Sequence, residues 1–289
     1  MKMKKWGVVA ASLMLVGTLG LFGCSSESAP ETTTNAPAET TAETTASTND
    51  QAATEAEDTA ATEGEVVLVE PGTLTIAASL DFPPFENLNG TEAEGFEVDL
   101  VNAIAEQMGL EANWVNSKFD TIVPQIQTGG KSDLGVSGIT ITDERLEQVD
   151  FTEPIVDVNQ SITVLKDSGI TSVDDLAGKK IGAQSGTTGY DWAAENVPDA
   201  EVVAFDEMTA VFAALEAGQI DAVAVDLPVA NYYVKGYDDQ EVIEEIPTGE
   251  QYGIAVSKEN PALLAAVNDA IAELRANGTY DQIADQWIR

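Results

Sequence analysis

Apolar strands and amphipathic helices alternate along residues 73–289, and this alternation restricts the fold more than any other feature of the sequence. In the first half, strands are predicted at 73–79, 111–117 and 133–138, and helices at 95–109, 119–129 and 142–149. In the second half, strands are predicted at 179–184, 201–206, 221–226 and 251–258, and helices at 187–197, 208–218, 228–236, 260–278 and 279–289. Regular alternation of this kind predicts α/β architecture with mostly parallel sheets.

Two breaks in the alternation divide this part of the chain. They fall near residues 161–169 and 246–253, so the chain leaves a first domain at one break and returns to it at the other. We expect two lobes, each a mostly parallel sheet flanked by helices, joined by a hinge with two crossings. Lobe 1 is predicted at 66–163 and 250–289, and lobe 2 at 164–249. A ligand cleft is expected between them, where the strands present their carboxyl ends.

The first residues have the features of an export signal. Three lysines precede an apolar stretch at 6–22, and LFGC resembles a bacterial lipobox, in which the cysteine is lipidated. We predict a lipoprotein signal peptide at 1–23 and a lipid anchor on Cys24, with a transmembrane anchor as the alternative. Residues 24–65 are rich in Thr, Glu and Ala and lack bulky apolar side chains, so we expect a disordered tether. The folded part is then expected on the extracytoplasmic face of the cell membrane, either extracellular or periplasmic.

Composition excludes several classes of function. The chain has 13 Lys and Arg against 50 Asp and Glu, with a net charge of −37, which argues against nucleic acid as a partner. It has no His and one Cys, so zinc sites and Ser-His or Cys-His catalysis are not expected. Catalysis would have to use carboxylates, Lys, Ser or Tyr. No catalytic residue, metal or cofactor is predicted.

Arg145 is the one arginine in the acidic stretch SGITITDERLEQVDFTEP, residues 137–154. One interpretation is a surface ion pair with a neighbouring acid, which would contribute about 0–1 kcal/mol. The other is a clamp on a ligand carboxylate, which suits the planar fork of the guanidinium. The backbone N–H of Thr140 and the helix start at Thr142 would add donors. Spacing alone leaves both interpretations open.

Three other features lie beside predicted strand ends. SGTTG at 185–189 is either a glycine loop with a capping threonine or a set of amides for an anion. Asp226 is either the N-cap of the next helix or the counter-charge of an ammonium group. Phe82, Phe85 and Phe119 are either core residues or walls around a ligand side chain.

Five segments resemble one known family when taken in order: DFPPFE, GFEVDLVNAIAEQMG, GITITDERLEQVDFTEP, DDLAGKKIGAQSGTTG and GQIDAVAVDLPVA. They resemble the extracytoplasmic amino-acid-binding proteins of ABC importers, solute-binding protein family 3, over residues 73–289. The resemblance implies the type II periplasmic binding protein fold. It also implies that Arg145 clamps the ligand α-carboxylate with the amides of Thr140 and Thr188, while Asp226 and the Gly138 carbonyl hold the α-ammonium.

The resemblance places the ligand side chain between Phe82 and Phe119. Further possible contacts are Ser79, Asp81, Ser137, Gln160, Gln184 and Val225. Ser79, Gln184 and Val225 are neutral, which favours a neutral or polar amino acid. Asp81 and Asp120 keep arginine and lysine open.

The expected activity is capture of a free amino acid by lobe closure, followed by delivery to an ABC transporter permease. The closed form is favoured because the ligand contacts both lobes. The protein is expected to be a monomer held at the membrane through lipidated Cys24. A carboxylate-dependent enzyme such as a dehydratase is the main alternative, and an extracellular sensor or adhesive module is another.

Overall fold

A computed structural model describes residues 64–289 of the 289-residue chain. The predicted signal peptide, Cys24 and nearly all of the predicted tether lie outside the described residues. Within the described part, no helix is both long and apolar enough to cross a membrane.

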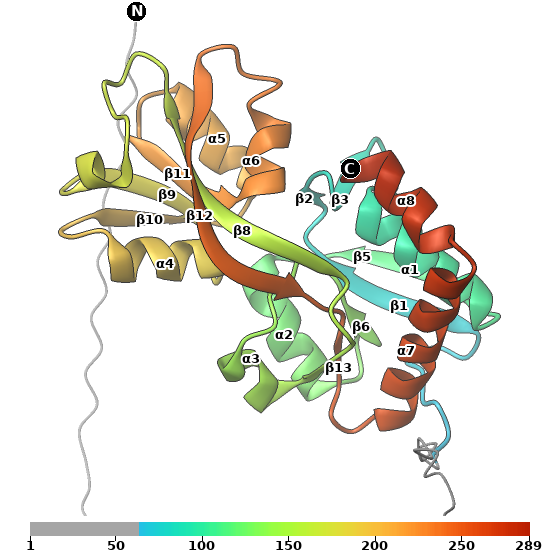
Figure 1. Cartoon of the computed structure of the whole chain (residues 1–289). Coiled ribbons are helices and arrows are strands. Elements are labelled where there is room, and N and C mark those ends of the chain that lie inside the picture. The colour runs from blue at the N-terminus through green and yellow to red at the C-terminus, as the bar shows by residue number, and fades with distance from the viewer. Residues whose placement is uncertain (1–63) are drawn as a thin grey trace, which may run out of the picture. The chain divides into compact units, whose positions relative to one another are not determined.

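The first of two five-stranded sheets has the strand order β5-β1-β6-β13-β7. Its strands are β1 (Thr73–Ala78), β5 (Glu111–Asn116), β6 (Leu134–Gly135), β7 (Asp150–Phe151) and β13 (Ala255–Val256). Around it lie α1 (Phe96–Gln107), α2 (Phe119–Thr128), α3 (Asp143–Gln148), α7 (Pro261–Ala276) and α8 (Thr279–Trp287). We call this sheet with its helices the first lobe (Figure 1).

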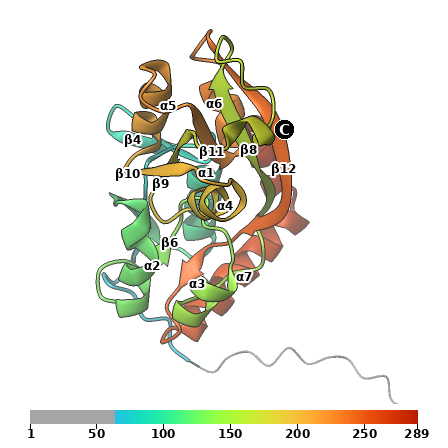
Figure 2. The ribbon, with the colours of Figure 1, turned by 90° about the vertical axis from the view of Figure 1, so that its left-hand side faces the viewer.

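The second sheet has the strand order β10-β9-β11-β8-β12. Its strands are β8 (Val156–Leu165), β9 (Lys180–Gln184), β10 (Glu201–Phe205), β11 (Ala222–Asp226) and β12 (Gln240–Tyr252). Its helices are α4 (Thr188–Asn196), α5 (Met208–Glu216), α6 (Leu227–Tyr233) and the 3₁₀ helix η1 (Val173–Leu176). We call this sheet with its helices the second lobe. Figure 2 shows α4 facing the viewer, above α2 and α3 of the first lobe.

The predicted alternation of strands and helices is confirmed, and so is the two-lobed α/β architecture. Each sheet is mixed, however, where the sequence predicted mostly parallel pairing. β1 is parallel to β5 and β6, and β9 is parallel to β10 and β11, but β13, β8 and β12 pair antiparallel with their neighbours. β8 and β12 are the strands by which the chain enters and leaves the second sheet, whereas β13 follows the return of the chain to the first sheet.

The hinge strands were not predicted. β8 and β12 are long antiparallel partners that run together from the second sheet toward the first (Figure 1). The predicted strand at 251–258 is therefore divided between the end of β12 at Tyr252 and the separate strand β13. A third, small antiparallel sheet was also missed: β2 (Asp81–Phe82), β3 (Glu86–Asn89) and β4 (Glu92–Glu94). Its strands are too short to show a period of two.

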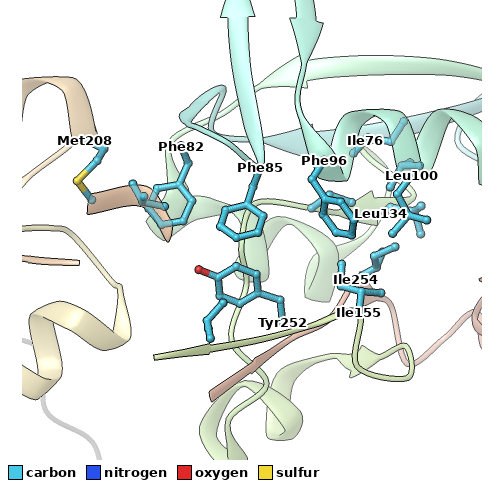
Figure 3. Close-up of a cluster of buried hydrophobic side chains, with 14 of the residues drawn as sticks. Ile76, Phe82, Phe85, Phe96, Leu100, Leu134, Ile155, Met208, Tyr252 and Ile254 are labelled. Atoms are coloured by element: carbon cyan, nitrogen blue, oxygen red, sulfur yellow. The ribbon is translucent and has the colours of Figure 1, made fainter. Parts of the chain in front are cut away.

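An apolar cluster contains buried side chains from both lobes and packs the lobes against each other (Figure 3). Phe85 packs edge-to-face on Tyr252, with ring centroids 5.0 Å apart, and also contacts Phe96. Phe82 of the first lobe and Met208 of α5 belong to this same cluster. The lobes therefore share buried apolar surface, which favours the arrangement in which they meet.

Candidate functional site

Arg145 projects from α3 toward the second lobe. Thr142 is the N-cap of α3, as predicted, because its Oγ1 accepts a hydrogen bond from the Arg145 N–H at 3.2 Å. The guanidinium donates from Nη1 to the Thr140 carbonyl at 2.7 Å and from Nη2 to the Gly186 carbonyl at 2.9 Å. Its Cζ lies 5.5 Å from the centroid of the Phe119 ring. Arg145 thus joins a loop of the first lobe to the loop before α4 of the second lobe.

The surface ion pair that was considered for Arg145 does not form among residues 64–289, where no carboxylate lies within ion-pair distance of it. Burial lowers the pKa of Arg145, while the negative charges of Asp191, Asp226 and Glu250 act on it from longer range. The guanidinium contacts only neutral carbonyl oxygens through its hydrogen bonds. Because no carboxylate pairs with it at close range, the positive charge of Arg145 favours the binding of an anion that enters the cleft.

Asp226 supplies negative charge at the end of β11. It occupies the N-cap position of α6, as one interpretation held, but its side chain makes no capping hydrogen bond. Its Oδ1 accepts a hydrogen bond from Gln160 Nε2 at 3.1 Å, and only 5% of the residue is exposed. Burial and, second, the negative charge of Glu250 raise the pKa of Asp226 from 3.8 to about 7. A nearby cation would favour the ionised carboxylate.

Glu250, near the end of β12, is a cleft residue that the sequence analysis missed. Its Oε2 accepts hydrogen bonds from Thr188 Oγ1 at 2.6 Å, from Thr140 Oγ1 at 2.9 Å and from Gln160 Nε2 at 3.3 Å. Thr188 begins α4 after the N-cap Thr187, and its Oγ1 lies 3.4 Å from Thr140 Oγ1. Thr140 and Thr188 were predicted near the ligand carboxylate. Their hydroxyls instead donate hydrogen bonds to a carboxylate of the protein itself, that of Glu250.

Gly138 has a positive φ of 54°, and a β-carbon there would lie 2.8 Å from the Phe82 ring. Its N–H donates to Glu97 Oε2 at 2.8 Å, while Ser137 Oγ donates to Glu86 Oε1 at 2.9 Å. Burial raises the pKa of both glutamates, and the adjacent charge of Glu97 raises that of Glu86 further. Neither glutamate was predicted, although Glu97 binds the backbone of Gly138 and Glu86 binds the side chain of Ser137 in the predicted ligand loop.

Ser79, Asp81 and Gln184 meet in a second group of contacts between the lobes. Ser79 Oγ donates to Asp81 Oδ1 at 2.8 Å and accepts from Gln184 Nε2 at 3.3 Å. Asp81 Oδ2 accepts from the Met208 N–H at 2.6 Å, and the Asp81 carbonyl accepts from the Tyr233 hydroxyl at 2.9 Å. Asp81 of the first lobe thus binds the start of α5 in the second.

The remaining predicted side-chain contacts are buried. Phe82 and Val225 lie in the apolar cluster that spans both lobes, and Phe119 lies in a smaller cluster of the first lobe. The burial of Phe82 and Phe119 agrees with the interpretation of these aromatic side chains as core residues. The Phe119 ring also lies beneath the guanidinium of Arg145.

Two cavities flank these residues. One of about 490 Å³ is lined by Phe119, Asp120, Arg145, Thr188 and Asp191, among others. The other, of about 420 Å³, is lined by Thr140, Thr142, Thr188 and Glu250, among others. Both border Thr188 and the N-terminus of α4. Within residues 64–289, no group of three or more acidic side chains is arranged to hold a metal ion.

Comparison with known proteins identifies a family of similar sequences and structures. The family model described as bacterial extracellular solute-binding proteins, family 3, matches residues 74–289. ABC transporter arginine-binding protein 1 of Escherichia coli K12 is 36% identical over 74% of this chain and 90% of its own length. The L-cystine-binding protein TcyJ of the same strain is 33% identical over 76% of this chain and 84% of its own length. The solved structure of an ancestral arginine-binding protein bound to arginine has a TM-score of 0.70 and 39% identity, covering 75% of this chain and 99% of that one.

Proposed function

The chain belongs to the bacterial extracellular solute-binding proteins of family 3, and we propose that it captures one amino acid between its lobes and presents it to an ABC transporter permease. Membership in this family places it among the amino-acid-binding proteins of ABC importers. The main observation behind the proposed binding site is the position of the Arg145 guanidinium. It lies between the lobes, and its hydrogen bonds go to neutral carbonyl oxygens.

The proposed site binds the two charged groups of an amino acid through different residues. Arg145 binds the α-carboxylate, with the amides of Thr140 and Thr188 as additional donors. Asp226 and the carbonyl of Gly138 bind the α-ammonium. Asp226 is buried and has a pKa of about 7. An ammonium group beside it would lower this pKa and favour the ionised carboxylate.

Binding is proposed to couple to closure of the lobes. Arg145 lies on α3 of the first lobe and Asp226 on β11 of the second, so a zwitterion contacts both. A ligand that binds the closed form better shifts the equilibrium toward it. The lobe boundaries expected from the sequence, 66–163 with 250–289 and 164–249, differ from the sheets at the two crossings, because all of β8 and all of β12 pair within the second sheet. Attachment through lipidated Cys24 and a monomeric state are also parts of the proposal.

For the ligand side chain, the contacts favour a neutral polar group. Ser79 and Gln184 are neutral, and both oxygens of the Asp81 carboxylate already accept hydrogen bonds, from Ser79 and from Met208. A cationic side chain would have to share the Asp81 carboxylate with these two donors. Arginine is the second candidate, because two of the relatives compared are named for it.

An enzymatic activity is the less favoured alternative. A buried carboxyl with a pKa of about 7, such as Asp226, has the property of a general acid. The relatives compared are binding proteins of transporters, however, and we propose that this chain is not an enzyme. Turnover of a prephenate-like acid by the purified protein would reverse this choice.

A thermal-shift screen of the twenty amino acids tests the proposal. A ligand present at a hundred times its Kd stabilises the folded protein by about 2.7 kcal/mol, which raises the melting temperature by several degrees. We expect one amino acid, or a small group with similar side chains, to produce this shift. If no amino acid changes the melting temperature, the proposed function is wrong.

A further inference from the structure

Glu250 is directed into the cleft by an irregularity in the hinge strand. Ile246 of β12 pairs with Gln160 of β8, but Glu250 pairs with Val158, so two additional residues are inserted on β12 between these pairs. Gly249, within this insertion, has a φ of 66°, and its N–H donates to Asn159 Oδ1 at 3.1 Å. An insertion of this kind changes the direction of the following side chains. It is the local reason that Glu250 reaches Thr140 and Thr188.

The Glu250 carboxylate is bound like a ligand anion. One of its oxygens accepts three hydrogen bonds, from Thr140 in the first lobe, Thr188 at the start of α4 and Gln160 on β8. Glu250 makes no ion pair among the residues that the structure describes. Its charge is therefore balanced by neutral donors and, from longer range, by Arg145.

The same two threonines are the ones that a free amino acid requires. In the proposed function, their backbone N–H groups receive the α-carboxylate beside Arg145, whereas Glu250 accepts hydrogen bonds from their hydroxyls. Two carboxylates beside the same two residues would repel each other. The cavity of about 420 Å³, lined by Thr140, Thr188 and Glu250, gives the displaced side chain space to move away from these donors.

We propose that Glu250 is a tethered competitor that occupies the anion position of the empty cleft and determines the affinity for the ligand. This inference rests on the proposed function of amino-acid binding. The incoming α-carboxylate displaces the Glu250 side chain from Thr140 and Thr188. The apparent Kd then exceeds the intrinsic Kd by the factor by which occupation by Glu250 reduces the binding-competent fraction.

The alternative role for Glu250 predicts an effect of opposite sign. If Glu250 remained in place and bound the ligand ammonium together with Asp226, removal of its charge would weaken binding. The two carboxylates share Gln160 Nε2 as a donor, so they are close enough to act together in this way. Affinity measurements on one substitution therefore distinguish the two roles.

The first experiment is titration calorimetry of Glu250→Gln with the amino acid found in the thermal-shift screen. We expect the variant to bind about tenfold more tightly than the wild type, as it would if Glu250 occupied the anion position in about nine of ten molecules. The matched control is Glu241→Gln, which removes one charge from the same strand at an exposed position that pairs with Val164. The control is expected to bind like the wild type. Unchanged or weaker binding by Glu250→Gln would overturn the proposal.

A second experiment uses propionate, which presents a free carboxylate without an ammonium group. In Glu250→Ala the donors of Thr140 and Thr188 are released, so we expect propionate to raise the melting temperature of this variant more than that of the wild type. An equal effect on both proteins would contradict the proposal. If no variant and no wild-type protein binds any amino acid, the proposed function fails, whereas wild-type binding without tightening by Glu250→Gln refutes only the competitor role.

Discussion

Glu250 and Asp81 are both carboxylates that accept hydrogen bonds from the opposite side of the cleft, yet their donors differ in kind. The donors to Glu250 are two side-chain hydroxyls and one side-chain amide, beside the charge of Arg145. One donor to Asp81 is the backbone N–H of Met208, at the start of α5, whose own N-cap residue makes no side-chain hydrogen bond. Hydroxyls can rotate toward a new anion, whereas the first N–H groups of a helix have no internal acceptor.

The difference indicates two functions for cleft carboxylates in this protein. Glu250 occupies donors that a ligand carboxylate can take over, so its contacts are exchangeable. Asp81 supplies the acceptor that α5 lacks, so its contacts favour the arrangement in which the lobes meet. Four substitutions or titrations test this distinction, besides the Glu250 variants.

The largest effect is expected from Arg145→Ala, which removes the charge that makes the Glu250 position attractive to an anion. Affinity for the amino acid is expected to fall about a hundredfold, or about 3 kcal/mol, in titration calorimetry. Arg275→Ala is a matched control, because Arg275 also stacks on an aromatic ring, that of Tyr280, but binds the Pro154 carbonyl away from the cleft. A loss of only a few-fold for Arg145→Ala would show that Arg145 does not clamp the ligand.

The next largest effect is expected from the titration of Asp226. An ammonium group needs the ionised carboxylate, and the pKa of Asp226 in the empty protein is about 7, so affinity is expected to fall about tenfold between pH 8 and pH 6. Arg145, Glu250 and Tyr252 are the other ionisable groups that act on it. Asp226→Asn is expected to bind weakly at every pH and without this slope. A wild-type affinity that is flat across this range would exclude Asp226 as the ammonium partner.

The same titration predicts the stability of the empty protein. The pKa of Asp226 is raised from 3.8 to about 7 on folding, so the folded state binds the proton more strongly. Stability from this group is therefore present at low pH and is lost as the pH rises toward about 7. The difference in melting temperature between pH 5 and pH 8 is expected to be smaller for Asp226→Asn than for the wild type.

A smaller effect is expected from Asp81→Ala, which removes the cap of α5 and the contact with Ser79. Loss of an N-cap costs about 1 kcal/mol, so closure is weakened and affinity is expected to fall about fivefold. The reduction should be equal for neutral and basic amino acids, because the contact that is lost joins the two lobes and does not involve the ligand side chain. A loss confined to arginine would instead make Asp81 a partner of the ligand side chain.

The smallest effect is expected from Lys118→Ala. Lys118 joins the lobes by an ion pair with Asp206, but both side chains are more than half exposed, at 60% and 62%. Exposed pairs contribute about 0–1 kcal/mol, so the affinity is expected to change less than twofold. A larger change would show that any charge across the cleft controls closure, and the contrast between Asp81 and Glu250 would lose its basis.

Much of the secondary structure could be predicted because its signals are local. The helix predicted at 95–109 corresponds to α1, and the helices predicted from 142 and from 260 begin at the N-caps Thr142 and Asn260. Periods of 2.0 and 3.6 residues, and capping side chains, depend on neighbours a few positions away. The hinge strands β8 and β12 and the small sheet were missed because they have no comparable periodic pattern.

By itself, the sequence determined the order of the helices and of most strands of the two large sheets, the two-lobed architecture and the membership in a family that binds amino acids. Only the tertiary structure decided which side chains meet in the cleft. Glu250 lies 110 positions from Thr140 and 62 from Thr188, and Asp81 lies 127 positions from Met208. Contacts over such separations depend on how the two sheets are placed by the hinge, so no local pattern of residues could identify them.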